Sequence, residues 1–142
     1  MIRTFEQRDM DAVLDIWLRA TLKAHDFIDA SFWQSQVDNM RHLYLTASQS
    51  YVIEQDARVL GFYSLHEDRL AALFVAPECQ GQGLGKRLLA HARTLRSVLN
   101  LGVYKNNTAS CAFYRAQGFV VIREQTDEQT GQREYLMRSV AP

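Results

Sequence analysis

The most informative stretch of this 142-residue sequence is LFVAPECQGQGLGKRLL, residues 73–89. An apolar run ends at Pro77, and three glycines then alternate at positions 81, 83 and 85 before a leucine-rich segment. A glycine-rich turn between a strand and a helix exposes successive backbone N–H groups, to which the helix N-terminus adds partial positive charge. We therefore predict a binding site for phosphate oxygens, with Lys86 and Arg87 adding positive charge. The alternative is a flexible turn in which glycine only supplies positive φ.

Two well-known phosphate loops do not fit this segment. A Walker A loop requires four residues between its glycine and Gly-Lys, followed by Ser or Thr, whereas Gly81 to Gly85 leaves three and Arg87 replaces the hydroxyl. A dinucleotide fingerprint requires G-x-G-x-x-G, and the spacing here is G-x-G-x-G. The segment is therefore neither a Walker A loop nor a dinucleotide fingerprint.

Periodicity along the chain predicts seven strands and four helices. Asp9, Ser31 and Asn107 are candidate N-caps for three of the helices. Because strands and helices alternate in mixed order around one sheet, we expect an α/β (α+β) fold with parallel and antiparallel pairs, and one domain spanning 1–142. The expected strands are 2–5, 51–55, 59–66, 69–76, 101–105, 119–125 and 134–140, and the expected helices are 9–24, 32–45, 86–99 and 108–117.

The composition argues against several classes of protein. Sixteen basic residues balance sixteen acidic ones, which disfavours nucleic-acid and anionic membrane partners. No segment approaches the roughly 20 apolar residues of a membrane span, so we expect a cytoplasmic protein. Cys79 and Cys111 are expected to be free thiols, and the scattered histidines predict no metal site.

Two motifs together resemble the GNAT superfamily, the GCN-five-related N-acetyltransferases. Gln80, Gly83 and Gly85 match the Q/R-x-x-G-x-G/A pattern of that family's acyl-CoA pyrophosphate loop. The segment NNTASCAFYRAQGF, residues 106–119, is similar to its second signature, an asparagine and a helical tyrosine followed by Gly-Phe. The resemblance covers residues 51–120 well and implies a mostly antiparallel sheet of about seven strands with a splayed central pair, flanked by about four helices.

The resemblance implies acetyl-CoA as co-substrate, with direct acetyl transfer to an amine. The backbone of Leu73, Phe74 and Val75 would pair with pantetheine like an added strand. The loop Gln80, Gly81, Gln82, Gly83, Leu84, Gly85 and Lys86 would hold the pyrophosphate, and Asn107 would reach the pantetheine arm. Tyr114 would protonate the leaving sulfur, because its ordinary pKa of about 10 keeps it protonated at pH 7. As alternatives, Asn107 is only a helix cap and Tyr114 only a core aromatic.

The general base and the acceptor site are less defined by the sequence. Glu67 follows the strand 59–66 and is our expected base, although His66 competes for this role and a solvated turn acid is an equal alternative. His25 and Phe27 lie in the connection KAHDFIDAS, residues 23–31, and are candidates for the wall of the acceptor pocket. The alternative is a histidine at a frayed helix end and a phenylalanine packed in the core. Cys111 has no nearby His–Asp arrangement in sequence, which disfavours a thiol nucleophile.

The expected function is an acetyl-CoA-dependent N-acetyltransferase that acts on a small-molecule, peptide or protein-lysine amine, as a monomer or homodimer. One alternative is a non-catalytic acyl-CoA-binding or regulatory module. The other is a toxin-like acetyltransferase of aminoacyl-tRNA, which the balanced charge disfavours.

Overall fold

The computed structural model describes residues 1–140 and contains a seven-stranded sheet in the order β1-β2-β3-β4-β5-β7-β6. All neighbouring pairs are antiparallel except β4 and β5, which confirms the predicted mixed sheet. The strands are β1 (Ile2–Thr4), β2 (Gln49–Gln55), β3 (Arg58–His66), β4 (Arg69–Val75), β5 (Asn100–Tyr104), β6 (Phe119–Thr126) and β7 (Arg133–Ser139).

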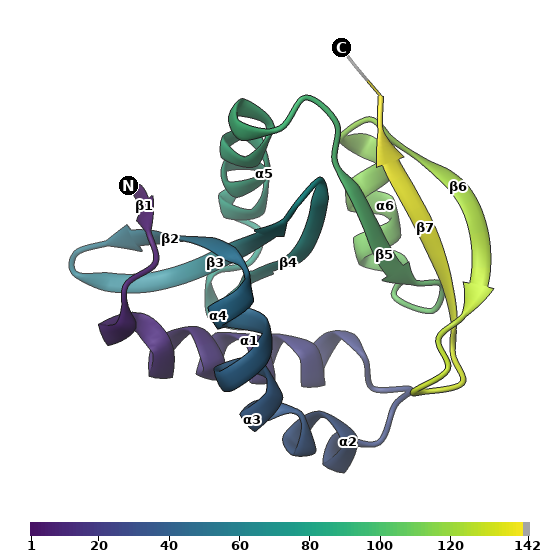
Figure 1. The fold of residues 1–142 in the computed structure, drawn as a ribbon, viewed down its shortest axis with the longest axis horizontal. Helices are drawn as coiled ribbons and strands as arrows, with labels where there is room; N and C mark the ends of the chain where they lie inside the picture. Colours follow the sequence, from purple (N-terminus) through teal and green to yellow (C-terminus); the bar gives the residue numbers. More distant parts are fainter. Residues whose placement is uncertain (141–142) are drawn as a thin grey trace.

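The two central strands part from one another, as expected for a splayed pair. β4 and β5 are parallel and share a single registered pair, Arg69 with Asn100. β4 remains paired with β3 as far as Val75, and β5 remains paired with β7 as far as Tyr104. The sheet therefore opens into a fork whose closed end lies at Arg69, and Figure 1 shows the two halves diverging there.

Helices cover both faces of the sheet (Figure 1). The short turn η1 (Gln7–Asp9) leads into α1 (Met10–Ala24), which packs on β3 and β4, and α5 (Leu84–Leu95) also contacts these two strands. η3 (Pro77–Cys79) follows β4, and α6 (Thr108–Ala116) packs on β5 and β6. The core between these layers includes large side chains with almost no exposure: Phe62, Tyr63, Leu65, Leu88 and Leu99.

The predicted helix 32–45 is an irregular segment, which we call the 30–47 segment. It consists of α2 (Ala30–Ser35), α3 (Val37–Asn39), a π-helical stretch (Met40–Tyr44) and α4 (Leu45–Ala47). The Ser35 hydroxyl donates to the Phe32 carbonyl, competing with the regular helical ladder where α2 ends. The predicted cap Ser31 is wrong, because Asp29 caps α2 by accepting from the Ser31 N–H. Asp9 likewise gives α1 no side-chain cap.

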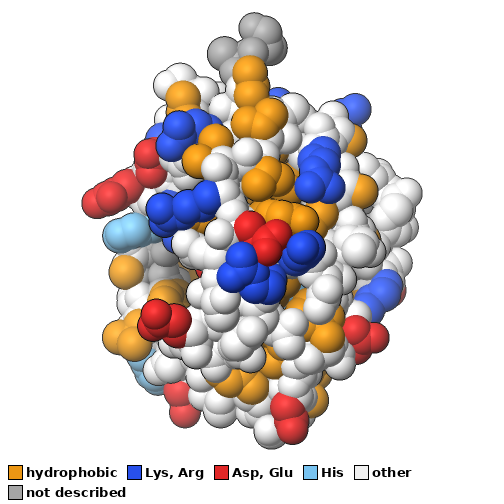
Figure 2. Space-filling model, turned by 90° about the vertical axis from the view of Figure 1, so that its right-hand side faces the viewer, with side chains coloured by type: hydrophobic (Ala, Val, Ile, Leu, Met, Phe, Trp, Pro, Cys, Tyr) orange, Lys and Arg blue, Asp and Glu red, His pale blue; other side chains and the backbone are white. Residues whose placement is uncertain are grey.

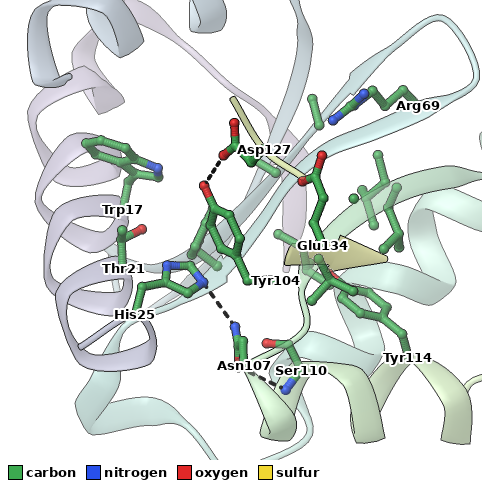
Figure 3. Close-up of a pocket in the computed structure, with 18 of the residues that line it drawn as sticks. Trp17, Thr21, His25, Arg69, Tyr104, Asn107, Ser110, Tyr114, Asp127 and Glu134 are labelled. Carbon is green, nitrogen blue, oxygen red and sulfur yellow. Dashed lines mark hydrogen bonds between the residues drawn. The ribbon is translucent and has the colours of Figure 1, made fainter. Parts of the chain in front are cut away.

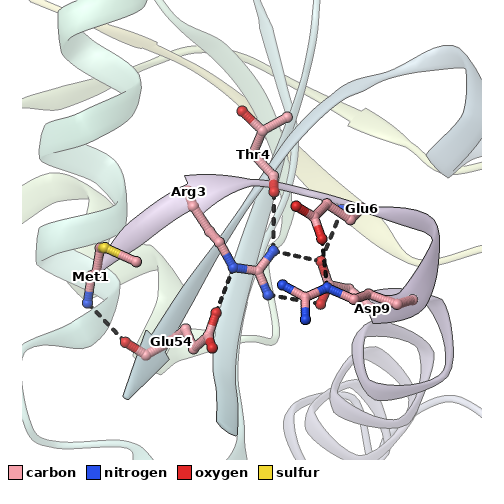
Figure 4. Close-up of polar contacts among 7 residues, drawn as sticks. Met1, Arg3, Thr4, Glu6, Asp9 and Glu54 are labelled. Atoms are coloured by element: carbon pink, nitrogen blue, oxygen red, sulfur yellow. Dashed lines mark hydrogen bonds and ion pairs between the residues drawn. The ribbon is translucent and has the colours of Figure 1, made fainter. Parts of the chain in front are cut away.

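An ion-pair cluster joins the N-terminal strand to the rest of the fold (Figure 4). Arg3 donates two hydrogen bonds to Asp9, at 2.8 and 2.9 Å, and one to Glu54 at 2.5 Å. Asp9 is buried and also accepts from the Glu6 N–H, and these contacts hold the pKa of its carboxyl below the ordinary value. Asp9 is therefore a structural carboxylate that orients β1 against the start of α1.

The face formed by the C-terminal hairpin carries apolar side chains on its edge strand. Val120, Val121 and Ile122 on β6 are exposed. Figure 2 shows hydrophobic side chains on this face interspersed with Lys and Arg, an arrangement that discourages edge-to-edge pairing. Across residues 1–140, the helices are too short or too polar to traverse a lipid bilayer.

Candidate active site

The glycine loop between η3 and α5 has the backbone geometry of an anion site. Gly81 and Gly83 have φ values of +82° and +81°, and open space lies where their side chains would be. Within residues 1–140, the backbone N–H groups of residues 81–86 donate to no backbone carbonyl. Six successive N–H groups, three in the loop and three in the first turn of the 12-residue helix α5, can therefore receive an anionic ligand.

This loop forms one wall of a cavity of ≈ 780 Å³, which we call the loop cavity. Most of the predicted phosphate-loop residues line it: Gln80, Gly81, Gly83, Leu84, Gly85 and Lys86. Lys23 on α1, which sequence reasoning missed, also lines the cavity and donates to the Gln80 side chain at 3.1 Å. Gln82 belongs to the same exposed loop but is absent from this wall.

A second cavity of ≈ 360 Å³, the fork cavity, lies in the gap between β4 and β5. Phe74 lines it, whereas Val75 lines the loop cavity. Four residues line both cavities: Leu73, Asn107, Ser110 and Tyr114. A ligand held by the glycine loop could therefore extend its far end past Leu73 to meet a second molecule in the fork.

Tyr114 lines both cavities and therefore lies where they meet. Figure 3 shows it at the edge of the fork cavity. Its ring packs edge-on against Phe113 and Phe119, at centroid distances of 5.2 and 5.4 Å. Within residues 1–140 its hydroxyl has no hydrogen-bond partner, and it is not among the inaccessible polar atoms, so it is available to a ligand in either cavity. Burial raises the pKa of Tyr114 above its ordinary value, which keeps the hydroxyl protonated at neutral pH.

His25 and Asn107 are hydrogen-bonded at the floor of the fork cavity (Figure 3). The Asn107 Oδ1 accepts from the Ser110 N–H at 3.2 Å, which confirms Asn107 as the N-cap of α6. Its Nδ2 therefore donates to the His25 Nε2 at 3.1 Å, so the His25 proton must reside on Nδ1. Desolvation lowers the pKa of His25 to about 4, so the ring is neutral at pH 7.

Two carboxylates from the C-terminal hairpin face the fork cavity, and sequence reasoning missed both. Asp127 accepts from the Tyr104 hydroxyl at 2.5 Å and from the Gln129 N–H at 3.1 Å. Glu134 accepts from Gln125 at 2.7 Å through Oε1. Its Oε2 lies 3.4 Å from the point where a side chain on Gly102 would begin, so the glycine leaves room for this carboxylate over β5.

The remaining predicted residues lie apart from this centre. Glu67 is an exposed turn residue with φ +56°, absent from the walls of both cavities, whose carbonyl accepts from Arg96 at 2.7 Å. His66 is also outside the fork cavity. Phe27 packs against the rings of His25 and Tyr104, behind the cavity wall. Burial raises the pKa of the Cys111 thiol, which argues against a thiolate nucleophile.

Comparisons with known proteins agree with this geometry. Residues 46–121 match the family model described as an acetyltransferase (GNAT) domain. The sequence is 39% identical over 123 residues to the peptidyl-lysine N-acetyltransferase YiaC of Escherichia coli (strain K12), covering 86% of this chain and 84% of that protein.

Solved structures show the same architecture. The solution structure of apo-form YjaB from Escherichia coli matches with a TM-score of 0.88 and 25% identity, over 100% of this chain and 98% of that one. The PaiA N-acetyltransferase from Thermoplasma acidophilum, solved in complex with coenzyme A, matches in fold with a TM-score of 0.81 and 18% identity, over 98% and 97% of the two chains. The chain therefore belongs to the GNAT family of N-acetyltransferases, and the acetyl-transfer activity and fold predicted from its two motifs are confirmed.

Proposed function

We propose that this protein transfers an acetyl group from acetyl-CoA directly to the side-chain amine of a peptidyl lysine. The observation that carries the proposal is the meeting of two cavities at Tyr114, one with an anion loop and one with carboxylates. YiaC, at 39% identity, acts on peptidyl lysine, which supports the same acceptor class here.

The loop cavity has the features that acetyl-CoA requires. The unpartnered N–H groups of residues 81–86 would bind the pyrophosphate, with Lys23 and Lys86 supplying positive charge. The backbone of Leu73 to Val75, which has no partner strand on the β5 side, would pair with the amides of the pantetheine arm. PaiA shares this fold and was solved with coenzyme A, which is consistent with the assignment.

Acetyl-CoA supplies an acetyl group activated as a thioester, and the chain supplies proton transfer and orientation. A lysine amine has an ordinary pKa of about 10.4, so a base must remove a proton before or during attack. Glu134 is our proposed base because Oε2 faces the fork cavity and accepts none of the hydrogen bonds recorded within residues 1–140. As the C–N bond forms and the C–S bond breaks, Tyr114 donates its proton to the leaving sulfur.

Replacing each candidate base tests the assignment. Glu134→Gln keeps an oxygen that can accept from Gln125 but removes the basic carboxylate, so we expect a loss of about 100-fold or more in kcat for acetylation of a lysine peptide. Glu67→Gln, at the exposed turn, should retain the activity of the unaltered protein. The opposite pattern would restore Glu67 as the base.

Acetyl-CoA binding can be measured separately from acetyl transfer. We expect acetyl-CoA at about 100 times its dissociation constant to raise the free energy of unfolding by about 2.7 kcal/mol. No thermal shift at any attainable concentration would refute the cofactor assignment, whatever the acceptor.

A further inference from the structure

A third cavity lies beside the fork cavity and has a different chemical character. It has a volume of ≈ 660 Å³ and lies between the 30–47 segment and the surface of β3 and β4. We call it the aromatic trough, since large apolar side chains form one wall: Phe32, Trp33, Met40, Leu43 and Tyr44. Small residues form its floor, with Ala72 and Ser64 paired across β4 and β3. His66 and Arg69, at the ends of these strands, also line the trough, whereas the small side chains of its floor leave the space above them open.

The aromatic trough and the fork cavity are adjoining spaces. They share seven wall residues, including Trp17, Trp33, Arg69 and Tyr104. A molecule whose amine lies in the fork cavity can therefore place its next part in the trough. Successive residues of an extended chain are only about 3.5 Å apart, so a neighbour of an acceptor lysine is within reach.

Polar groups on the shared wall fit the backbone of a peptide. The Trp17 side chain is 6% exposed, and Figure 3 shows its indole nitrogen directed toward the space near Asp127. An indole N–H is a donor only, so it requires an acceptor. A backbone carbonyl of a peptide in the fork cavity would supply that acceptor, whereas an apolar ligand would not. The Trp33 Nε1 also has no hydrogen-bond partner, but it has almost no accessible surface and is not offered to a ligand.

The outer rim of the trough is apolar and exposed to solvent. Leu43 and Tyr44 are adjacent in the π-helical stretch and are 58% and 51% exposed. π-Helical turns are rare and frequently occur at functional sites. Two neighbouring exposed apolar side chains at the mouth of an aromatic cavity can cover an apolar group that enters it.

We propose that the aromatic trough binds an apolar side chain adjacent to the acceptor lysine, while a backbone carbonyl of the same peptide accepts from Trp17. The inference rests on the proposed peptidyl-lysine activity and adds sequence preference to it. A lone lysine occupies only the fork cavity, whereas a peptide with an apolar neighbour occupies both spaces.

Three acceptors test the proposal by thiol release from acetyl-CoA. They are Nα-acetyl-lysine amide, a peptide with leucine on both sides of the lysine, and the same peptide with serine in those positions. We expect the leucine-flanked peptide to have a kcat/KM about ten-fold or more above the serine-flanked one, because burial of an apolar side chain favours it. Leu43→Ser should remove most of this preference and leave Nα-acetyl-lysine amide unaffected.

Leu95→Ser is the matched control, because Leu95 on α5 is also exposed and lines none of the three cavities. It should retain the full preference, and Tyr44→Ser should reproduce the effect of Leu43→Ser. The proposal is overturned if the two peptides react equally in the unaltered protein. It is also overturned if Leu43→Ser slows all three acceptors by the same factor. If no lysine acceptor reacts although acetyl-CoA stabilises the protein, the peptidyl-lysine activity itself fails.

Discussion

Acidification should destabilise this protein through His25. The ring is buried, its Nε2 accepts from Asn107, and its pKa in the folded protein is lowered from 6.5 to about 4 by desolvation. Below pH 6.5 the unfolded chain binds a proton at this position and the folded protein does not. Because the unfolded state then binds more protons, the free energy of unfolding falls as the pH falls from 6.5 through 4.

The size of the effect follows from the two pKa values. At 1.36 kcal/mol per pH unit, the full effect is about 3 kcal/mol, and about 2.5 kcal/mol of it is lost by pH 4.5. Protonation also changes the contact with Asn107, since both partners then present N–H groups. Asn107 caps α6, which carries Tyr114, so the same proton should slow catalysis as well as weaken the fold.

Denaturant unfolding at pH 7.5 and pH 4.5 measures this contribution. His25→Gln retains an atom that can accept from Asn107 but does not titrate, so its loss of unfolding free energy between the two pH values should be smaller by about 2.5 kcal/mol. His42→Gln, at an exposed histidine, should lose as much as the unaltered protein. Equal losses in the unaltered protein and in His25→Gln would refute the argument, because other groups would then account for the acid sensitivity.

Three other substitutions separate catalysis, ligand binding and stability. Tyr114→Phe removes the proposed acid and should lower kcat by about 10²- to 10⁴-fold, measured by thiol release. The free energy of unfolding should not fall in denaturant unfolding, because the ring contacts remain and no hydrogen bond is lost. Gly85→Ala adds a methyl group to the glycine loop and should therefore raise the dissociation constant of acetyl-CoA. The free energy of unfolding should be unchanged or slightly greater, because the methyl group would lie at an ordinary 3.7 Å from Phe113. Calorimetric titration measures the affinity, and a retained affinity would contradict the prediction. Arg3→Met should cost about 1–3 kcal/mol of unfolding free energy by leaving the buried Asp9 without its partner, whereas Arg8→Met, at an exposed ion pair, should cost less than about 1 kcal/mol in the same denaturant experiment.

The sheet and the glycine loop could be predicted from sequence because their signals are local. Short runs rich in apolar and β-branched residues, bounded by turn residues, mark the strands, and glycine at positions 81 and 83 readily adopts the positive φ that the loop requires. Asn107 was recognised as a cap for the same reason, since its acceptor contact is three residues away. The regular helix expected at 32–45 was wrong because side-chain competition and tertiary packing, rather than apolar spacing, determine the winding of that segment.

The carboxylates facing the fork could not be predicted, because their position depends on strand register. Glu134 reaches the fork because β7 pairs with β5 so that Glu134 is opposite Tyr104, and because Gly102 leaves space beside it. Neither fact can be read from the segment around Glu134. Glu67 was chosen for its closeness in sequence to β4, but a turn residue with positive φ can point away from the strand that it precedes. Glycine at position 102 in the middle of β5 was the available signal, since a strand glycine often marks a close approach by another group.

The parting of β4 and β5 explains why one incomplete sheet can hold two substrates. A complete parallel ladder would satisfy the β4 backbone groups that face β5, and its absence leaves those beyond Arg69 without a strand partner, beside the two cavities. A ligand with amide groups can restore those hydrogen bonds on one side, and an acceptor can approach from the other. This arrangement requires the fork to remain open in the absence of ligand. The pairs β3–β4 and β5–β7 hold the two sides of the fork in place, because both continue their pairing past the point where β4 and β5 separate. Acetyl-CoA binding should consequently add order at the fork without rearranging the sheet, so the energy of binding can be used to align the thioester with the amine.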